Sequence, residues 1–77
     1  MTELLVTIAQ GLVEDPSQVT VSADEPNEEG IVVFHLHVAE SDMGRVIGKQ
    51  GRIAKSIRTV MRAAANRDGI KVAVEIE

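Results

Sequence analysis

The residues with the clearest chemical potential lie in the segment 46–57, VIGKQGRIAKSI. Gly48 and Gly51 permit backbone conformations that a side chain would forbid, and they let another molecule approach the chain closely. A helical pattern begins directly after them, and the first turn of a helix presents free N–H groups that suit an anion. Lys49 and Arg52 add positive charge at the same place. The segment therefore predicts a phosphate-contacting turn.

Charge is distributed unevenly along the 77 residues, whose net charge is −4. All eight Lys and Arg lie between Arg45 and Lys71, where Asp68 is the only acid, whereas the first 44 residues contain nine acids and no base. A nucleic-acid-binding protein need not be basic overall if its basic residues are gathered in one region. A solvated helix face explains a run of charges equally well, but the neighbouring glycines favour the binding interpretation.

The length predicts one domain, residues 1–77, whose small core leaves a thin margin of stability. The chain has no cysteine, so packing or oligomerisation must supply what a disulfide or thiolate metal site would otherwise add. The N-terminus carries an acid where a signal peptide has a base, and no apolar run approaches the roughly 18 residues of a membrane span. We expect a soluble, cytoplasmic protein.

The first half of the chain predicts a helix and two strands. Apolar residues at helical spacing follow Thr2, which we expect to cap the helix, and Pro16 ends the pattern. Alternating residues predict strands over 18–24 and 31–39, separated by the polar connector 24–30. This connector carries four acids and no base. The two strands are expected to form an antiparallel hairpin.

The second half predicts two helices and a strand. A short helix over 41–47, capped by Ser41 or Asp42, ends at the glycine turn, and a longer helix runs over 52–66. Gly69 stands where a helix is expected to close, and alternation over 70–77 predicts a strand. The expected buried stripe of the longer helix consists of Ile53, Ile57, Val60, Met61 and Ala64.

The order is therefore α-β-β-α-α-β, an α+β fold. A helical crossover of roughly 30 residues joins the strands 31–39 and 70–77, which favours parallel neighbours. Strand 31–39 carries apolar residues on both faces, as a central strand does. We expect a three-stranded mixed sheet with 31–39 in the middle and the helices packed on one face.

The segment Val46-Ile47-Gly48-Lys49-Gln50-Gly51 resembles the Ile-Gly-x-x-Gly core of the KH domain. The order of elements is similar to the type II, prokaryotic KH arrangement, in which a helix and a strand precede the common β-α-α-β unit. The resemblance covers essentially the whole chain. Its length is similar to that of the small, free-standing bacterial KH proteins.

The resemblance implies binding of single-stranded RNA, of which a KH domain clamps about four nucleotides. By this resemblance Gly48 and Gly51 let phosphates approach, Lys49 supplies charge and Gln50 a neutral hydrogen-bonding group. The apolar floor and the surrounding positive charge would come from Ile47, Ile53, Arg45, Arg52 and Lys55.

The resemblance also implies partners. Small proteins of this kind are associated with a larger KH-containing protein, and the pair is linked to RNA chaperoning and to control of the cell wall and cell shape. We therefore expect a homodimer, a heterodimer with a second KH protein, or both. No cofactor is implied.

Two departures from the family pattern favour weak and loosely specific binding. The common pattern has isoleucine three residues after the second glycine, where this chain has Ala54. The connector 24–30 corresponds to a variable loop that can flank the groove, and its acids would repel a phosphate backbone. A second RNA-binding domain could raise the overall affinity of such weak binding.

The other sequence patterns give weaker evidence of a function. His35 and His37 share a strand face, but a metal site would need a third ligand that the sequence does not supply. Gly44 to Lys49 has one residue too few for a P-loop, and no nucleophile–base pair indicates an enzyme. Phe34 is the only aromatic residue, which disfavours an RRM-type sheet that stacks bases. The alternative to RNA binding is a dimerisation module whose RNA binding is weak or supplied by its partner.

Overall fold

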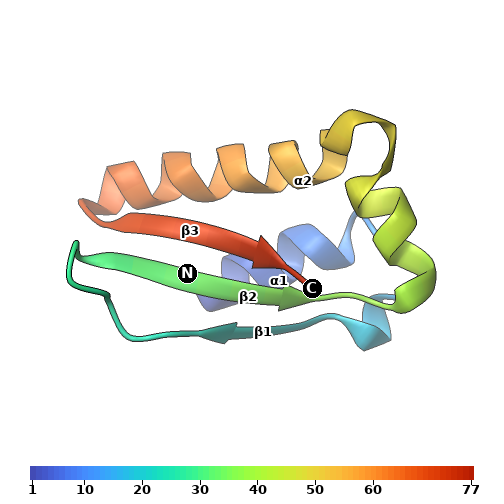
Figure 1. The fold of residues 1–77 in the computed structure, drawn as a ribbon, viewed down its shortest axis with the longest axis horizontal. Coiled ribbons are helices and arrows are strands. Elements are labelled where there is room, and N and C mark those ends of the chain that lie inside the picture. Colours follow the sequence, from blue (N-terminus) through green and yellow to red (C-terminus); the bar gives the residue numbers. More distant parts are fainter.

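The computed structural model describes residues 1–44, 46 and 51–77. Its elements, shown in Figure 1, are α1 (Thr2–Gln10), a short 3-10 helix (Pro16–Gln18), β1 (Thr20–Ala23), β2 (Ile31–His37), α2 (Glu40–Asp68) and β3 (Lys71–Ile76). Within the described part of the chain, no helix has the length and apolar character needed to cross a membrane.

The three strands form one mixed sheet in the order β1-β2-β3. β1 runs antiparallel to β2, with Val21 opposite Leu36, and β3 runs parallel to β2, with Val74 opposite Phe34. The expected hairpin, the parallel pairing across the helical crossover and the central position of the second strand are all confirmed. The first strand begins two residues later than expected because Pro16–Gln18 form the 3-10 helix.

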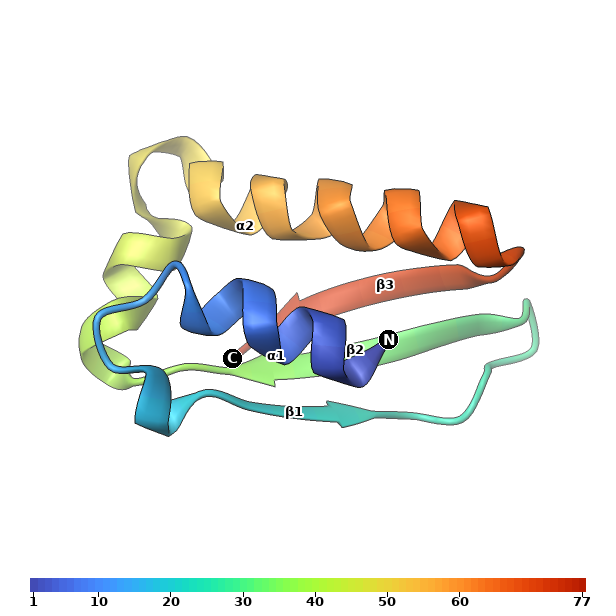
Figure 2. The same ribbon diagram turned by 180° about the vertical axis from the view of Figure 1, so that it is seen from behind.

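One face of the sheet carries the core. Alternate residues of β2 and β3 point to the same side because their side chains have a period of two. Phe34, Leu36 and Val74 are buried there in one cluster with Leu5 of α1 and Met61 of α2. Figures 1 and 2 show both helices on this side of the sheet. The expectation that the helices cover a single face is confirmed, and the opposite face of the sheet is left open.

The helices expected over 41–47 and 52–66 are joined in one element, α2. Gly51 has φ 65°, a left-handed value that breaks the regular helical path. Figure 1 shows that α2 changes direction sharply between its first arm (residues 40–44) and its second arm (residues 52–68). The predicted α-β-β-α-α-β order therefore holds, with the last two helices forming the arms of one bent element.

The buried stripe of the second arm differs from the expected one. The buried residues are Ala54, Ile57, Met61 and Ala65, whereas Val60 is 44% exposed and Ile53 and Ala64 are half-buried. Ile57 and Met61 are buried as expected, and both sets have helical spacing, so the arm is rotated by less than one residue position from the expected orientation. Ala54, which departs from the family pattern, lies in the core, where its small side chain lets the arm approach the sheet closely.

The predicted helix ends are partly right. Gly69 closes α2 with φ 72°, and the N–H of Ile70 donates to Ala65 O at 2.9 Å, as a left-handed glycine cap requires. The predicted N-caps are wrong, because α1 and α2 start after Met1 and Ala39 without a side-chain capping bond. Thr2 is already inside α1, and Asp42 has a different set of partners, described below.

Candidate nucleic-acid interface

The predicted site lies at the bend of α2. Gly51, Arg52, Ile53 and Lys55 open the second arm, where Arg52 and Lys55 are exposed and Ile53 packs partly against the core. The left-handed φ of Gly51 fits a turn that a side chain would strain. The other predicted site residues lie outside the described residues; they are Arg45, Ile47, Gly48, Lys49 and Gln50.

A basic face continues along the second arm from this bend. Arg52, Lys55, Arg58 and Arg62 follow one another at intervals of three or four residues, so they are neighbours on one side of the helix. All four are exposed. The face is about 15 Å long, at 1.5 Å of helix per residue. Positive charge therefore extends along the helix well beyond the glycine turn.

This basic face borders a groove between α2 and the edge strand β3. Arg58 reaches across it, and its Nε–H donates to Val74 O at 3.3 Å. Arg58 and Arg62 line a shallow cavity of about 180 Å³ together with residues 72–74 of β3. The glycine turn and this groove therefore lie along one helix arm, so a single extended ligand could contact both.

Sequence reasoning missed this groove. It named Arg52 and Lys55 of the longer helix as ligand contacts, but neither Arg58 nor Arg62. Arg58 and Arg62 each directly follow a buried residue, Ile57 and Met61, and therefore lie beside the stripe. The spacing of Arg58 and Arg62 from the buried residues could have indicated that they border a groove. That spacing is informative only once β3 is known to lie on the same side of the helix.

The acidic connector lies away from the glycine turn. It joins β1 to β2 at the end of the sheet where β2 and β3 begin, because Ile31 is opposite Lys71. Gly51 belongs to α2, the element that follows the opposite end of β2, a strand of seven residues or about 23 Å. Asn27 holds the connector in shape, since its Oδ1 accepts the N–H groups of Glu29 and Ile31 at 2.9 and 3.0 Å. The expectation that the connector flanks the groove stays a prediction, because β3 begins at this end of the sheet and its residues 72–74 line the cavity.

Asp42 ties the first arm of α2 to the segment that follows α1. The N–H groups of Glu14 and Asp15 donate to its Oδ1 and Oδ2 at 3.0 and 3.1 Å. The residue is only 2% exposed and is the one buried polar or charged side chain within the described part of the chain. Its carboxylate therefore fixes the first arm, which leads directly into the glycine turn.

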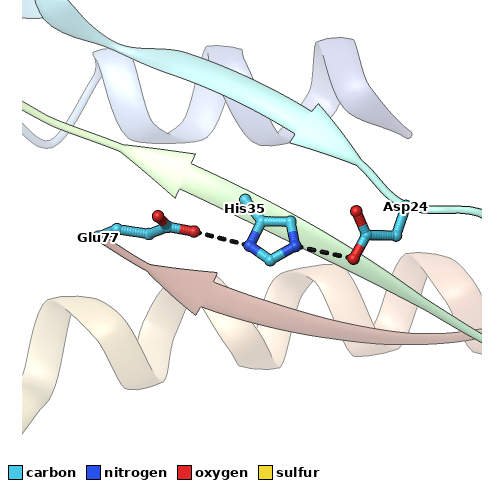
Figure 3. Close-up of polar contacts among 3 residues, drawn as sticks. All are labelled: Asp24, His35 and Glu77. Carbon is cyan, nitrogen blue, oxygen red and sulfur yellow. Dashed lines mark hydrogen bonds and ion pairs between the residues drawn. The ribbon is translucent and has the colours of Figure 1, made fainter.

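His35 links all three strands on the open face of the sheet. Its Nε2 lies 2.9 Å from Asp24 Oδ2 and its Nδ1 lies 2.7 Å from Glu77 Oε1, as Figure 3 shows. Asp24 directly follows β1 and Glu77 directly follows β3. The hydrogen bonds to Asp24 and then to Glu77 raise the pKa of His35 above its ordinary value of 6.5. Among the residues that the structure describes, no group of three or more His, Asp and Glu could hold a metal ion.

A pH-dependent contribution to stability follows from the raised pKa of His35. A group whose pKa is higher in the folded state stabilises it fully below the unfolded pKa, and the effect is lost as pH rises through the folded pKa. His35→Gln should therefore lower the free energy of unfolding more at pH 5.5 than at pH 8.5, as measured by urea denaturation.

The carboxylate partners supply the control for this experiment. In a background carrying Asp24→Asn and Glu77→Gln, His35→Gln should have an effect that no longer depends on pH, because both hydrogen-bonding anions are gone. An equal cost of His35→Gln at both pH values in the wild-type background would contradict the contact in solution.

The bent helix between parallel strands, preceded by an α-β unit, defines a type II KH fold. Two solved structures of Era share it. The chain of Aquifex aeolicus Era bound to GDP and aluminium fluoride has a TM-score of 0.68 and 24% identity. Era in complex with MgGDPNP and a segment of 16S ribosomal RNA has a TM-score of 0.68 and 22% identity. In both, the match covers 97% of this chain and 28% of the Era chain, so the likeness concerns the fold alone.

Sequence comparison identifies the family. The family model "KhpA/KhpB, KH domain" matches residues 2–76. RNA-binding protein KhpA of Clostridium acetobutylicum is 54% identical over 76 residues, and that of Clostridium perfringens is 51% identical, each match covering 99% of both chains. KhpA of Listeria monocytogenes is 42% identical, covering 99% of this chain and 97% of its own. The chain belongs to the KhpA/KhpB KH-domain family, which is not an enzyme family.

Proposed function

We propose that this protein binds single-stranded RNA, with the backbone at the glycine turn and the bases in the groove beside β3. The observation that carries the proposal is the continuous path from Gly51 along the basic face to the cavity lined by Arg58 and Arg62. Arg58 follows Gly51 by seven residues, about 10 Å along the helix. The relatives named above are RNA-binding proteins, which supports the same function here.

The predicted residues take distinct roles in this proposal. Gly48 and Gly51 let the phosphates approach, Lys49 supplies positive charge and Gln50 a neutral hydrogen bond. Exposed Arg52 and Lys55 add electrostatic attraction from the second arm. Arg45 completes the charge, and Ile47 and Ile53 form the apolar floor beneath the nucleotides.

Reversing the charge of the turn tests the proposal. Lys49→Asp combined with Gln50→Asp should abolish RNA association, because two acids would face the phosphate backbone. Crosslinking to cellular RNA measures the loss, and circular dichroism with urea unfolding shows whether the fold is kept. Undiminished crosslinking in a folded variant would refute RNA binding at this turn.

A charge-matched control separates the turn from the overall charge. The triple variant Thr7→Glu, Gln10→Glu and Gln18→Glu also lowers the net charge by three, but it changes exposed residues of α1 and the 3-10 helix. These elements do not line the proposed RNA path, which runs over α2 and β3. This variant should therefore keep most of its RNA affinity.

The cellular role that we propose is carried by the family resemblance. The protein would act in the cytoplasm as an RNA chaperone or post-transcriptional regulator, together with a larger KH protein of the KhpB (Jag, EloR) type. Control of cell-wall synthesis and cell shape belongs to the same proposal. Co-purification of the larger KH protein with this chain at native expression levels is the measurement that tests the partnership.

A second candidate function, self-association, is favoured by an apolar groove on the other side of the second arm. Leu4 of α1 and Val60, Ala63, Ala64 and Arg67 of α2 line a shallow hollow of about 420 Å³. Leu4 is 37% exposed and Val60 is 44% exposed. The alanines would let a helix of a second copy approach closely, and the exposed apolar side chains of Leu4 and Val60 would be buried in that contact. We therefore propose a second copy of this chain as the occupant.

Sedimentation distinguishes the two candidate functions. Val60→Arg should yield a monomer at tens of micromolar while leaving the glycine turn unchanged. The variant with acids at 49 and 50 should remain a dimer but lose RNA. A wild-type protein that sediments as a monomer at that concentration would refute self-association.

A further inference from the structure

The groove beside β3 presents an edge of backbone groups that no strand pairs with. Successive residues of a strand direct their N–H and C=O groups to opposite edges. The N–H of Glu77 donates to Leu36 O at 2.8 Å, so this residue faces β2. Val74 O faces the other way and accepts from Arg58. By the same alternation, the N–H groups of Val72 and Val74 and the carbonyl oxygen of Val72 face the groove.

Arg58 changes the chemistry of that edge. Its Nε–H occupies Val74 O, an acceptor that would otherwise be open to a ligand. A guanidinium has five N–H donors and no acceptor, so the remaining donors of Arg58 stay available. Within the described part of the chain, the terminal nitrogens of Arg58 and Arg62 make no hydrogen bond or ion pair. Around the cavity, donors therefore outnumber acceptors.

We propose that this groove selects guanine and that Arg58 is the residue that determines the selection. The inference rests on the proposed RNA binding and adds to it the base that the groove takes. Guanine presents two adjacent acceptors, O6 and N7, and a bidentate contact from arginine to these atoms is the commonest specific contact to a base. In single-stranded RNA, this edge of a base is free to be read.

The other bases fit a donor-rich groove less well. Adenine presents N7 beside an amino donor, and cytosine presents an amino donor on the corresponding edge. Either donor would face a donor of Arg58, leaving both groups desolvated and unpaired. Uracil offers a single carbonyl oxygen on that edge and cannot take both guanidinium donors. The bond to Val74 O also holds the planar side chain of Arg58 in place before the base arrives, which lysine cannot reproduce.

Binding of short RNAs that differ at one position tests the inference. Fluorescence anisotropy would be measured with uridine-rich heptamers in which a single guanine is moved through the central positions and replaced by adenine, cytosine or uracil. A correct bidentate contact should favour guanine by about tenfold or more at one position. Inosine, which keeps O6 and N7, should bind as guanine does, whereas 7-deazaguanine, which lacks N7, should lose most of the preference.

Variants then assign the preference to a residue. Arg58→Gln should bring the four RNAs to nearly equal affinity, whereas Arg58→Lys, which keeps donors for O6 and N7 but lacks the fixed planar group, should keep part of the preference. Arg52→Gln removes the same charge from the other end of the basic face and should weaken binding to all four RNAs alike. A merely structural Arg58 would change stability without changing the ratio between bases.

The possible outcomes separate this inference from the proposed function. Equal binding of the four RNAs by the wild-type protein, or a guanine preference that survives in Arg58→Gln, overturns the role of Arg58 while leaving RNA binding intact. No binding of any heptamer or longer single strand overturns both. If Arg58→Gln fails to fold, the inosine and 7-deazaguanine measurements on the wild-type protein still decide the matter.

Discussion

Asp42→Ala is expected to lower the free energy of unfolding by about 2 kcal/mol, because a buried backbone donor left unpaired costs about 1–3 kcal/mol. The carboxylate of Asp42 is the acceptor for the N–H groups of both Glu14 and Asp15. Alanine would offer neither group a partner. The segment around these N–H groups is partly open to solvent, so water would recover part of the loss. Urea denaturation followed by circular dichroism measures the change.

Two further variants make this expectation specific. Asp42→Asn keeps one oxygen acceptor but turns an NH₂ donor toward the other N–H, so it should fall between the wild type and Asp42→Ala. Asp68→Ala removes an exposed acid from the last turn of the same helix and should change stability by no more than about 0.5 kcal/mol. If Asp42→Ala cost no more than Asp68→Ala, the contact between the first arm of α2 and the segment after α1 would not hold in solution.

The role of Asp42 shows where sequence reasoning reaches its limit. An acid at the start of a helical pattern predicts a cap, which is a local contact. Its partners in the structure lie 28 and 27 residues earlier in the chain. Nothing in the local sequence separates a cap from such a distant contact, since both place an acid in the first turn. The strands were easier to predict, because alternation of apolar residues and the length of the crossover fix their pairing and direction.

The orientation of the second arm illustrates a different limit. The expected and the observed stripe both satisfy the helical period and share Ile57 and Met61, and the expected stripe contains the larger side chains. The expected stripe is 53-57-60-61-64 and the observed one is 54-57-61-65. Close packing against the sheet favours the second set, with alanines at 54 and 65. This small rotation brings Arg58 and Arg62 to the edge of β3 and exposes Val60. The sequence could predict the glycine turn, but the groove beside it depends on packing that a single sequence does not reveal.

The position of the acidic connector follows from the topology. Once strand 31–39 is central and parallel to strand 70–77, the connector before it must lie at the end of the sheet where both strands begin. The glycine turn follows the opposite end of β2. The predicted pairing thus already implied that the acids lie far from the turn, at the end of the sheet where β3 and its groove begin.

Gly51→Ala and Gly44→Ala are expected to change stability in opposite directions. An alanine Cβ would meet no atom within 4 Å at either position, so crowding contributes nothing. Gly51 has φ 65°, where an L-residue costs about 1–2 kcal/mol, and Gly51→Ala should lower the free energy of unfolding by that amount. Gly44 lies in the first arm of α2 and is not among the glycines with positive φ. Gly44→Ala should therefore raise the free energy of unfolding by up to about 1 kcal/mol. Urea denaturation of the two variants gives the comparison.

Variants at the two glycines also distinguish the effect of backbone conformation on RNA affinity from the effect of an added methyl group. Gly44→Ala should keep its RNA affinity, whereas Gly51→Ala should lose several-fold, because it disfavours the bend that joins the turn to the groove. A chain of 77 residues is within reach of chemical synthesis, and D-alanine at position 51 favours positive φ while adding the same methyl group. The D-residue should restore stability. If it also restores RNA affinity, the bend is what binding requires; if affinity stays low, the methyl group itself blocks the approach of a phosphate. Equal stability of the L- and D-alanine proteins would contradict the left-handed conformation of Gly51.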